Sequence, residues 1–285
     1  AAEIRAHGPV NFSRFMEAAL YEPGLGYYRT TRDPFGAGGD FYTASQLQPV
    51  FGRLVAAFAA QTRTALGNPA DFAFIEWGAG RAELAPYLDG FGYNAVDSGH
   101  GTPTKPFEGV VFSNELFDAL PVDVACWRQG RFTVKRVGCN GDTFQWVDGE
   151  PLNGPWLDYA NSLVENFDQR DEVWIELPVR LKETLDAMCA PLRRGCMVAI
   201  DYGYTAREIL RFPAGTLMSY RRHRALDDVL AEPGVQDITA HVPFTYLCDS
   251  GTQLGLRPLR MESLMAFLMR VGEPSQFGTA LKADD

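Results

Sequence analysis

Short apolar runs alternate with amphipathic segments along the chain, which predicts strands and helices in turn. Apolar residues recur three and four positions apart over 12–20 and 47–58, the spacing of a helix with one buried face, and Asn11 or Ser13 could cap the first helix. Short, nearly continuous apolar runs are typical of buried strands, and they occupy 72–75, 93–97, 110–112, 173–177 and 196–200. Further helices are predicted at 84–88, 156–167, 181–188, 244–254 and 261–268. This alternation indicates an α/β fold with a doubly wound sheet.

Some stretches depart from the alternation. Polar and apolar residues alternate over 125–146 around Gln129-Gly130 and Asn140-Gly141, which predicts hairpins. Segment 98–109 is rich in glycine and proline, and we expect a loop that leaves little room for a helix and another strand. We expect Arg193-Arg194-Gly195 to end the helix at 181–188, and residues 205–242 to be mostly loop.

The strand at 72–75 continues into a glycine turn, Glu76-Trp77-Gly78-Ala79-Gly80, followed by residues that can open a helix. Glycines let a backbone turn tightly and approach a ligand, and a helix N-terminus offers free N–H groups. A dinucleotide fingerprint would place a third glycine at position 83, where Glu83 stands, so an NAD-dependent oxidoreductase is disfavoured. Glu76 instead resembles the acidic residue in the first motif of S-adenosyl-L-methionine (SAM) methyltransferases. From this stretch alone, an ordinary strand-to-helix turn remains the alternative.

Four predicted strands end in polar side chains, namely Glu76, Asp97, Asn114-Glu115 and Asp201. Ligands of open α/β sheets bind beyond the carboxyl ends of the strands, so this edge is a candidate site. Asp97 could accept the ribose hydroxyls of an adenosine. A surface aspartate that closes a strand is the equally weighted alternative.

Composition limits the classes of partner. The chain has 285 residues and a net charge of −10 with no basic block, which argues against nucleic acid as the main partner. No apolar run is long enough to span a membrane. The five cysteines form no C-x-x-C pair and indicate free thiols in a reducing compartment. No zinc-type spacing of ligands surrounds the histidines, so no metal site is expected.

Longer signatures carry a family resemblance over nearly the whole chain. The run 114–122, Asn-Glu-Leu-Phe-Asp-Ala-Leu-Pro-Val, and the run 201–204, Asp-Tyr-Gly-Tyr, are specific in combination. With segments 8–10, 15–16, 21–28, 39–44, 51–52, 76–84, 215–217 and 237–242, and with Tyr220 and His223, they resemble the MidA-like family of SAM-dependent methyltransferases. Mitochondrial members of that family assist complex I assembly by methylating a protein arginine.

The resemblance implies a Rossmann-like SAM methyltransferase sheet with an N-terminal helical cap and a β-hairpin insertion, in one domain over 1–285. We expect the cap at 1–70, the cofactor half at 71–124, the hairpin and helix insertion at 125–170 and the C-terminal half of the sheet at 171–285.

The resemblance also implies roles for individual residues. The cofactor is SAM, and its candidate binding residues are Glu76, Gly78, Gly80, Asp97, Asp40, Thr43 and Asn114. Glu115 and Asp118 are the catalytic candidates, because carboxylates can grip a guanidinium and aim one nitrogen at the methyl group. Candidates on the substrate side are Asp201, His223 and His241, although a hydrogen-bonded structural role is favoured for both histidines.

Four departures from the family pattern affect the cofactor half. The family usually has proline at position 79 and glycine at position 82, where this chain has Ala79 and Ala82, and Trp77 is bulky beside a cofactor. The family also has a helix and a strand where this chain has only 98–109. We therefore hypothesise a compact member with a shallower, weakened SAM pocket. The alternative function is a divergent binding or assembly factor that has weakened or lost SAM binding.

The expected partner is a protein substrate, by family resemblance a subunit of a respiratory complex, and the oligomeric state stays open, a dimer included. The first residues show no signal-peptide core. The expected location is the cytoplasm, with the mitochondrial matrix as the alternative if a targeting segment has been removed.

Overall fold

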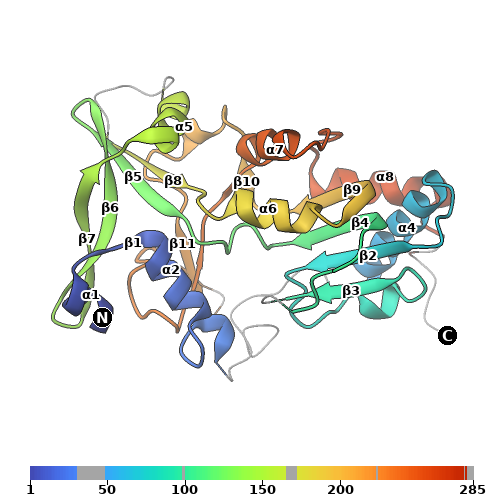
Figure 1. The fold of residues 1–285 in the computed structure, drawn as a ribbon, viewed down its shortest axis with the longest axis horizontal. Helices are drawn as coiled ribbons and strands as arrows, with labels where there is room; N and C mark the ends of the chain where they lie inside the picture. The colour runs from blue at the N-terminus through green and yellow to red at the C-terminus, as the bar shows by residue number, and fades with distance from the viewer. Residues whose placement is uncertain (31–48, 98–99, 165–171, 223, 279, 281–285) are drawn as a thin grey trace. The chain divides into compact units, whose positions relative to one another are not determined.

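The computed structural model describes residues 1–30, 49–97, 100–164, 172–222, 224–278 and 280. The chain divides into two compact units, which are described one at a time. Unit 1 comprises Ala1–Phe41, Phe117–Lys182 and Tyr202–Leu247, and unit 2 comprises Tyr42–Leu116, Glu183–Asp201 and Cys248–Asp285. Figure 1 shows the chain coloured from its N-terminus to its C-terminus.

Unit 2 contains the predicted parallel sheet. Its order is β3-β2-β4-β9, and every neighbouring pair is parallel. The strands are β2 (Phe72–Trp77), β3 (Tyr93–Val96), β4 (Phe107–Asn114) and β9 (Leu192–Ile200). All four strands were predicted, and β4 and β9 begin earlier than their apolar runs. The Rossmann-like α/β prediction is therefore confirmed for this unit.

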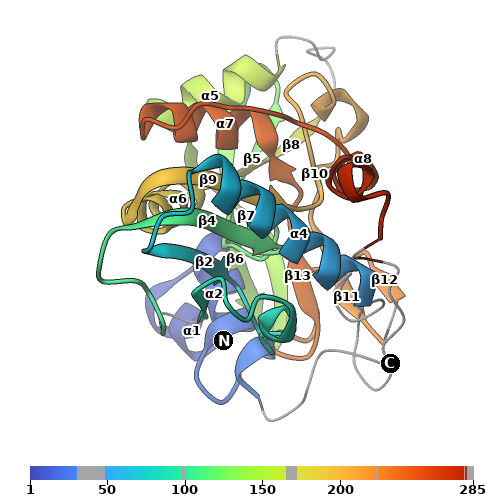
Figure 2. The same ribbon diagram turned by 90° about the vertical axis from the view of Figure 1, so that its right-hand side faces the viewer.

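One face of the sheet is covered by α4 (Pro49–Ala65), whose Phe51, Val55 and Ala59 pack against strand residues such as Phe74 and Phe112. The Phe74 and Phe112 ring centroids lie 5.4 Å apart. Figure 2 shows α4 in front of these strands. The helices α7 (Phe244–Gln253) and α8 (Leu264–Gly272) confirm two further predictions. The buried face of α8 is not the one that the apolar spacing predicted. The helix buries Phe267 and Val271, while Met265 is 74% exposed.

The described part of 98–109 is a loop up to Phe107, where β4 begins. The short helix expected at 84–88 is a 3₁₀ turn at Ala85–Tyr87. In the described residues, the sheet therefore ends at β3, because no further strand pairs with its free side. This agrees with the prediction that no helix and strand fit between β3 and β4.

One helix end was predicted wrongly. The helix α6 (Leu181–Cys189) ends before the arginines, and Arg193-Arg194-Gly195 lie inside β9. The reason is pairing across the sheet, since Arg193 Nη2 and Arg194 Nε donate to the Glu108 carboxylate on β4 at 2.9 and 2.8 Å. Gly195 also packs closely against the backbone of Gly109, where a side chain would not fit.

Unit 1 contains an antiparallel sheet of order β1-β6-β5-β8, with β7 paired to β6. The strands are β1 (Val10–Asn11), β5 (Asp123–Arg128), β6 (Arg131–Asn140), β7 (Thr143–Pro151) and β8 (Val173–Leu177). The predicted hairpins are confirmed, and Gln129 and Gly130 both have positive φ, 53° and 83°, as a tight hairpin turn requires. β8 pairs antiparallel with β5, so from residue 171 onward β9 alone joins the parallel sheet.

The helices of unit 1 are α1 (Ala2–His7), α2 (Phe12–Tyr21) and α5 (Gly154–Val164). The predicted cap of α2 is only partly right. Asn11 occupies the N-cap position without capping, and Asp123 Oδ1 on β5 accepts instead from the Ser13 N–H at 3.1 Å. This ties the helix to the sheet, where Phe12 and Met16 join a core cluster with Val124.

The segment 205–242 was predicted to be mostly loop, but it contains a small antiparallel sheet. The prediction missed this sheet because such short strands leave only a weak apolar pattern in the sequence. Its order is β12-β11-β13. The strands are β11 (Met218–Arg221), β12 (Arg224–Leu226) and β13 (Asp237–Thr239). A two-residue parallel pair, β10 (Gly203–Tyr204) with β14 (Val242–Pro243), flanks it.

Candidate active site

The structure brings the polar strand ends of unit 2 to one edge. Glu76, Asp97, Asn114 and Asp201 lie at or directly after the carboxyl ends of four adjacent parallel strands. Neighbouring strands lie about 4.8 Å apart, so successive side chains on this edge can contact one small ligand. The arrows of β2, β3 and β4 in Figure 1 end at the same side.

Glu76 is buried at this edge, with 7% of its surface exposed. The Tyr93 hydroxyl donates to Glu76 Oε2 at 2.5 Å, and no Lys or Arg of the described residues forms an ion pair with it. Burial raises the pKa of Glu76 to about 7, against the Tyr93 hydrogen bond, and the nearby Glu83 charge adds to the rise. A buried carboxyl group without a cation suits a cationic ligand group.

The glycine turn has the backbone that its sequence predicts. Gly78 and Gly80 have φ of 69° and 51°, in the left-handed region that favours glycine. A side chain at Gly78 would place its Cβ 3.0 Å from Leu116 Cδ1. Ala82 also has a positive φ, 53°, and only a 3₁₀ turn follows. An alanine at position 82, where the family usually has glycine, therefore strains the backbone of the turn.

Glu115 follows β4 in a left-handed conformation with φ of 52°. Its N–H donates to the Ile200 carbonyl at 2.8 Å, which fixes the backbone to the end of β9. Its side chain is half-buried, and burial raises its pKa. A non-glycine residue held in this conformation is typical of functional sites.

Three buried polar atoms at this edge have no hydrogen-bond partner among the described residues. They are Trp77 Nε1, Ser113 Oγ and Asn114 Oδ1. Buried polar atoms are normally satisfied, so these three suit a polar ligand or ordered water. Glu76 pairs with Phe112 on β4, and Asn114 is two residues after Phe112. Since side chains alternate along a strand, Asn114 lies on the same sheet face as Glu76. Together with Glu76 and the glycine turn, Asn114 Oδ1 fits the amino-acid end of SAM, whereas Trp77 and Ser113 pair with each other and lie on the other face of the sheet.

The remaining candidates are divided. Asp118 and His241 belong to unit 1, where the Ala240 N–H donates to the Asp118 carbonyl at 2.9 Å. His241 packs against Phe212 with ring centroids 5.2 Å apart, and burial lowers its pKa. Its Nδ1 is buried and has no partner among the described residues. The candidates Asp40, Thr43 and His223 lie outside the described residues.

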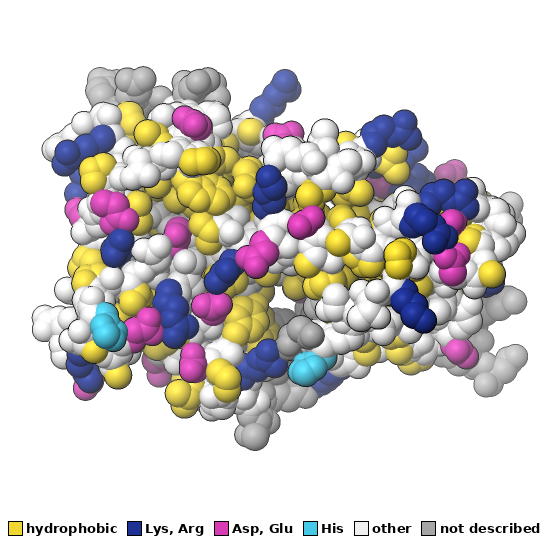
Figure 3. All heavy atoms as spheres, viewed as in Figure 1, with side chains coloured by type: hydrophobic (Ala, Val, Ile, Leu, Met, Phe, Trp, Pro, Cys, Tyr) yellow, Lys and Arg dark blue, Asp and Glu magenta, His cyan; other side chains and the backbone are white. Residues whose placement is uncertain are grey.

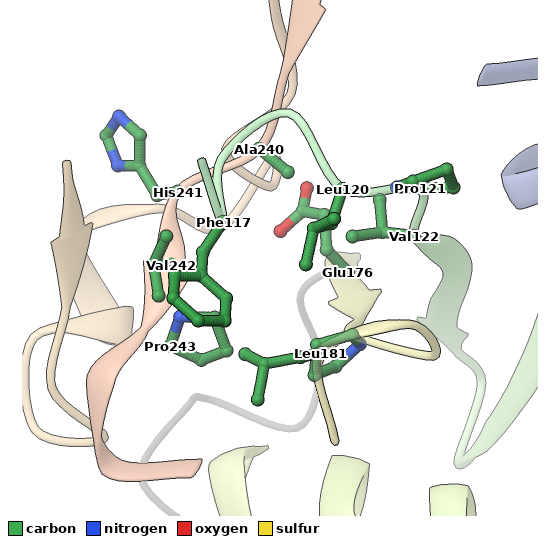
Figure 4. A pocket seen from close by; sticks show the side chains of 11 residues that line it. Phe117, Leu120, Pro121, Val122, Glu176, Leu181, Ala240, His241, Val242 and Pro243 are labelled. Atoms are coloured by element: carbon green, nitrogen blue, oxygen red, sulfur yellow. The ribbon is translucent and has the colours of Figure 1, made fainter. Parts of the chain in front are cut away.

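A small hollow in unit 1 is lined by the signature residues Phe117 and Leu120, among others, and by Glu176 (Figure 4). The imidazole of His241 points away from it in that view. Glu176 is 3% exposed and accepts from the Thr216 N–H at 2.7 Å and from its hydroxyl at 3.1 Å. Sequence analysis missed Glu176, because its role depends on a loop about forty residues away. Its hydrogen bonds give it a structural function in holding that loop.

Neither a membrane helix nor a metal cluster is found in the described residues. No helix there is long and apolar enough to cross a bilayer, and no group of three or more His, Cys, Asp or Glu side chains could hold a metal ion. All five cysteines are free. On the face drawn in Figure 3, Lys and Arg lie among Asp and Glu rather than in one basic surface.

A parallel sheet with a glycine turn after its central strand, and acidic residues along its carboxyl edge, defines a Rossmann-like methyltransferase. Comparison with known proteins is specific. Residues 97–261 match the family described as "Putative S-adenosyl-L-methionine-dependent methyltransferase". The chain belongs to this family, of which the MidA-like proteins are members.

Relatives and solved structures agree with this assignment. The chain is 33% identical to human "Protein arginine methyltransferase NDUFAF7, mitochondrial", over 92% of the chain and 70% of that protein. It is 25% identical to the zebrafish protein of the same name, over 100% of the chain and 78% of the relative. A crystal structure from Burkholderia thailandensis with bound S-adenosyl-homocysteine (SAH) matches with a TM-score of 0.85 and 30% identity, over 98% of this chain and 84% of that one.

These findings confirm the family, the fold class, SAM as cofactor and the assignment as a SAM-dependent methyltransferase. The names of the relatives place those proteins in mitochondria, so the expectation of a cytoplasmic protein gains no support.

Proposed function

We propose that this chain transfers the methyl group of SAM to an arginine side chain of a protein. The observation that carries the proposal is the carboxyl edge of the parallel sheet, where Glu76 lies near the end of β2 and Asp97 and Glu115 directly follow β3 and β4. The names of the relatives, protein arginine methyltransferases, supply the substrate class.

On the cofactor side, Glu76 would receive the ammonium group of SAM, and Gly78 and Gly80 would leave room for its methionine end. Asp97 is exposed directly after β3 and would accept the ribose hydroxyls. The orphaned Asn114 Oδ1 supports a further contact. When bound, SAM supplies an electrophilic methyl group. Asp40 and Thr43 remain proposed as residues that close over the cofactor.

On the substrate side, Glu115 would grip the guanidinium of arginine, and Asp118 stays proposed as a second catalytic carboxylate. A carboxylate binds a guanidinium through two parallel hydrogen bonds, which fixes the plane of the group and can aim one nitrogen at the methyl carbon. Burial raises the pKa of Glu115, and an arriving cation reverses that effect and favours the ionised form. Asp201, His223 and His241 stay proposed as neighbours of the substrate.

The test is labelled-methyl transfer from SAM into a lysate of the source organism, followed by peptide mapping. We expect label on arginine in one or a few proteins, and a subunit of a respiratory complex is the proposed target. Label on another residue type would refute arginine as the acceptor. The same mapping separates mono- from dimethylation.

A binding or assembly factor with weakened or lost SAM binding is the second candidate. It is favoured by the sheet that ends at β3 in the described residues and by the strained backbone of Ala82. SAM or SAH that co-purifies with the protein would decide for the enzyme. Of the two proposed locations, the mitochondrial matrix agrees with the names of the relatives.

A further inference from the structure

Tyr93 is the first residue of β3 and lies diagonally across from Glu76. In the parallel pairing, Glu76 stands opposite Ala95, and Tyr93 is two residues before Ala95 on the same face. Diagonal neighbours are within reach of a long aromatic side chain. The Tyr93 hydroxyl accordingly donates to Glu76 Oε2 at 2.5 Å.

This is the one side-chain hydrogen bond to Glu76 found among the described residues. The other side chain that acts on Glu76 is Glu83, whose negative charge repels the ionised form of Glu76. Without the hydroxyl, the carboxylate would be buried with neither a donor nor a cation, which is costly. The position of Glu76 in the cofactor-free protein therefore depends on Tyr93.

Resting on the proposed role of Glu76, we propose that Tyr93 is a positioning residue for the cofactor: its hydroxyl holds the Glu76 carboxylate where it receives the ammonium group of SAM. One carboxylate oxygen accepts from Tyr93, and the other is left for the ligand. A hydrogen bond to the ionised form also favours ionisation, which the ammonium group requires.

The proposal has a consequence for pH dependence. The pKa of Glu76 is about 7, so the neutral carboxyl must lose its proton when the ammonium group binds below that pH. Removing the Tyr93 hydroxyl takes away a contact that lowers this pKa, so the pKa should rise further. Cofactor binding in such a variant should then require a higher pH than in the wild type.

The experiment is calorimetric titration of SAH between pH 6 and pH 9 into the wild type, Tyr93→Phe, Glu76→Gln and the control Tyr87→Phe. Tyr87 is a tyrosine of the same unit, and it is not among the groups of the described residues that act on the Glu76 carboxyl. We expect the wild-type affinity to rise about tenfold per pH unit below pH 7 and then to level off. Tyr93→Phe should bind about tenfold more weakly at pH 7 and approach the wild type at pH 9. Glu76→Gln should bind weakly at every pH.

A second ligand separates positioning from folding. 5′-Methylthioadenosine carries the adenosine without the amino-acid end, so Tyr93→Phe should bind it as the wild type does. The amino group of SAH is the same in every titration, so its own ionisation cancels between variants.

Each other outcome is decisive. If Tyr93→Phe binds SAH like the wild type at every pH, Tyr93 does not position Glu76. A loss that is equal at every pH and extends to 5′-methylthioadenosine would assign Tyr93 a general structural role instead. If Glu76→Gln binds SAH normally, the role of Glu76 is wrong. A wild type that binds neither ligand would overturn the proposed function itself, and this inference with it.

Discussion

At the scale of single residues, the raised pKa of Glu76 makes the stability of the cofactor-free protein depend on pH. Its folded-state pKa of about 7 lies above the ordinary value of 4.5. A raised carboxyl pKa contributes stability that is fully present below the unfolded value and is lost as the pH rises through the folded value. The cofactor-free protein should therefore lose stability between about pH 4.5 and pH 7 through this group.

Glu76→Gln should remove this loss, because glutamine stays neutral. At pH 8 we expect the free energy of unfolding of the cofactor-free variant to exceed that of the wild type by about 1–3 kcal/mol, from 1.36 kcal/mol per pKa unit. At pH 4 the two proteins should be nearly equal. Urea unfolding at both pH values measures the difference, and an equal difference at pH 4 and pH 8 would contradict a titrating Glu76.

Ala82 gives a second prediction at this scale. An alanine in the left-handed conformation costs about 1–2 kcal/mol. Glycine removes this strain, but it loses more backbone entropy on folding, so the net gain in stability is smaller. Ala82→Gly should raise the free energy of unfolding by about 0.5–1 kcal/mol and tighten SAM binding severalfold. Ala79→Gly is the matched control in the same turn, and it should lower stability because the φ of Ala79 is not positive. If both variants lose stability in thermal melts, backbone strain at Ala82 is not the cause.

Glu115 has a strained, left-handed backbone and carries a carboxylate that we propose to be catalytic. Glu115→Gln keeps the size of the side chain and removes its charge, so methyl transfer should fall at least a hundredfold while SAH binding stays within a few-fold of the wild type. Glu115→Gly should be equally inactive yet more stable by about 0.5–1 kcal/mol, because it relieves the φ of 52°. Activity retained in Glu115→Gln would remove Glu115 from the mechanism.

At the scale of elements, hydrogen bonds to Glu176 connect β8 to the loop that contains Gly215 and Thr216. Gly215 has φ of 81°, and a Cβ there would lie 2.5 Å from Glu176 Oε1. The close approach lets Thr216 donate from both its N–H and its hydroxyl to the carboxylate. Glycine at 215 is thus needed for two reasons, its backbone conformation and the space beside it.

Gly215→Ala should therefore destabilise the protein by about 2–4 kcal/mol, the sum of the left-handed backbone and the overlap. Gly130→Ala provides the control, since Gly130 has a similar φ of 83° with nothing within 4 Å of the added Cβ. That variant should lose only about 1 kcal/mol. Urea unfolding compares the two, and equal losses would show that Glu176 does not depend on the close approach.

At the scale of the molecule, local patterns predicted the parts that depend on near neighbours in sequence. The strands β2 and β3, the glycine turn and the acidic strand ends could be predicted because period and spacing are local properties. Tyr93 could not be linked to Glu76 without the register between two strands. β8 has the same buried pattern as a parallel strand, so only its partner β5 shows that it belongs to the antiparallel sheet. Glu176 and Asp123 act on segments about forty or more residues away, beyond the reach of any local pattern.

The short connection between β3 and β4 leads to the last prediction. In the described residues the sheet ends at β3, where the family resemblance leads us to expect a further helix and strand that would contact the adenine of SAM. With fewer protein contacts, more of the adenine stays exposed to water when SAM is bound. Each 1.4 kcal/mol of lost binding free energy weakens the affinity tenfold. Isothermal titration of SAM should therefore give a Kd of roughly tens to hundreds of micromolar. A Kd of about one micromolar or tighter would contradict the weakened pocket, because the short connection would then supply as many contacts as the missing elements.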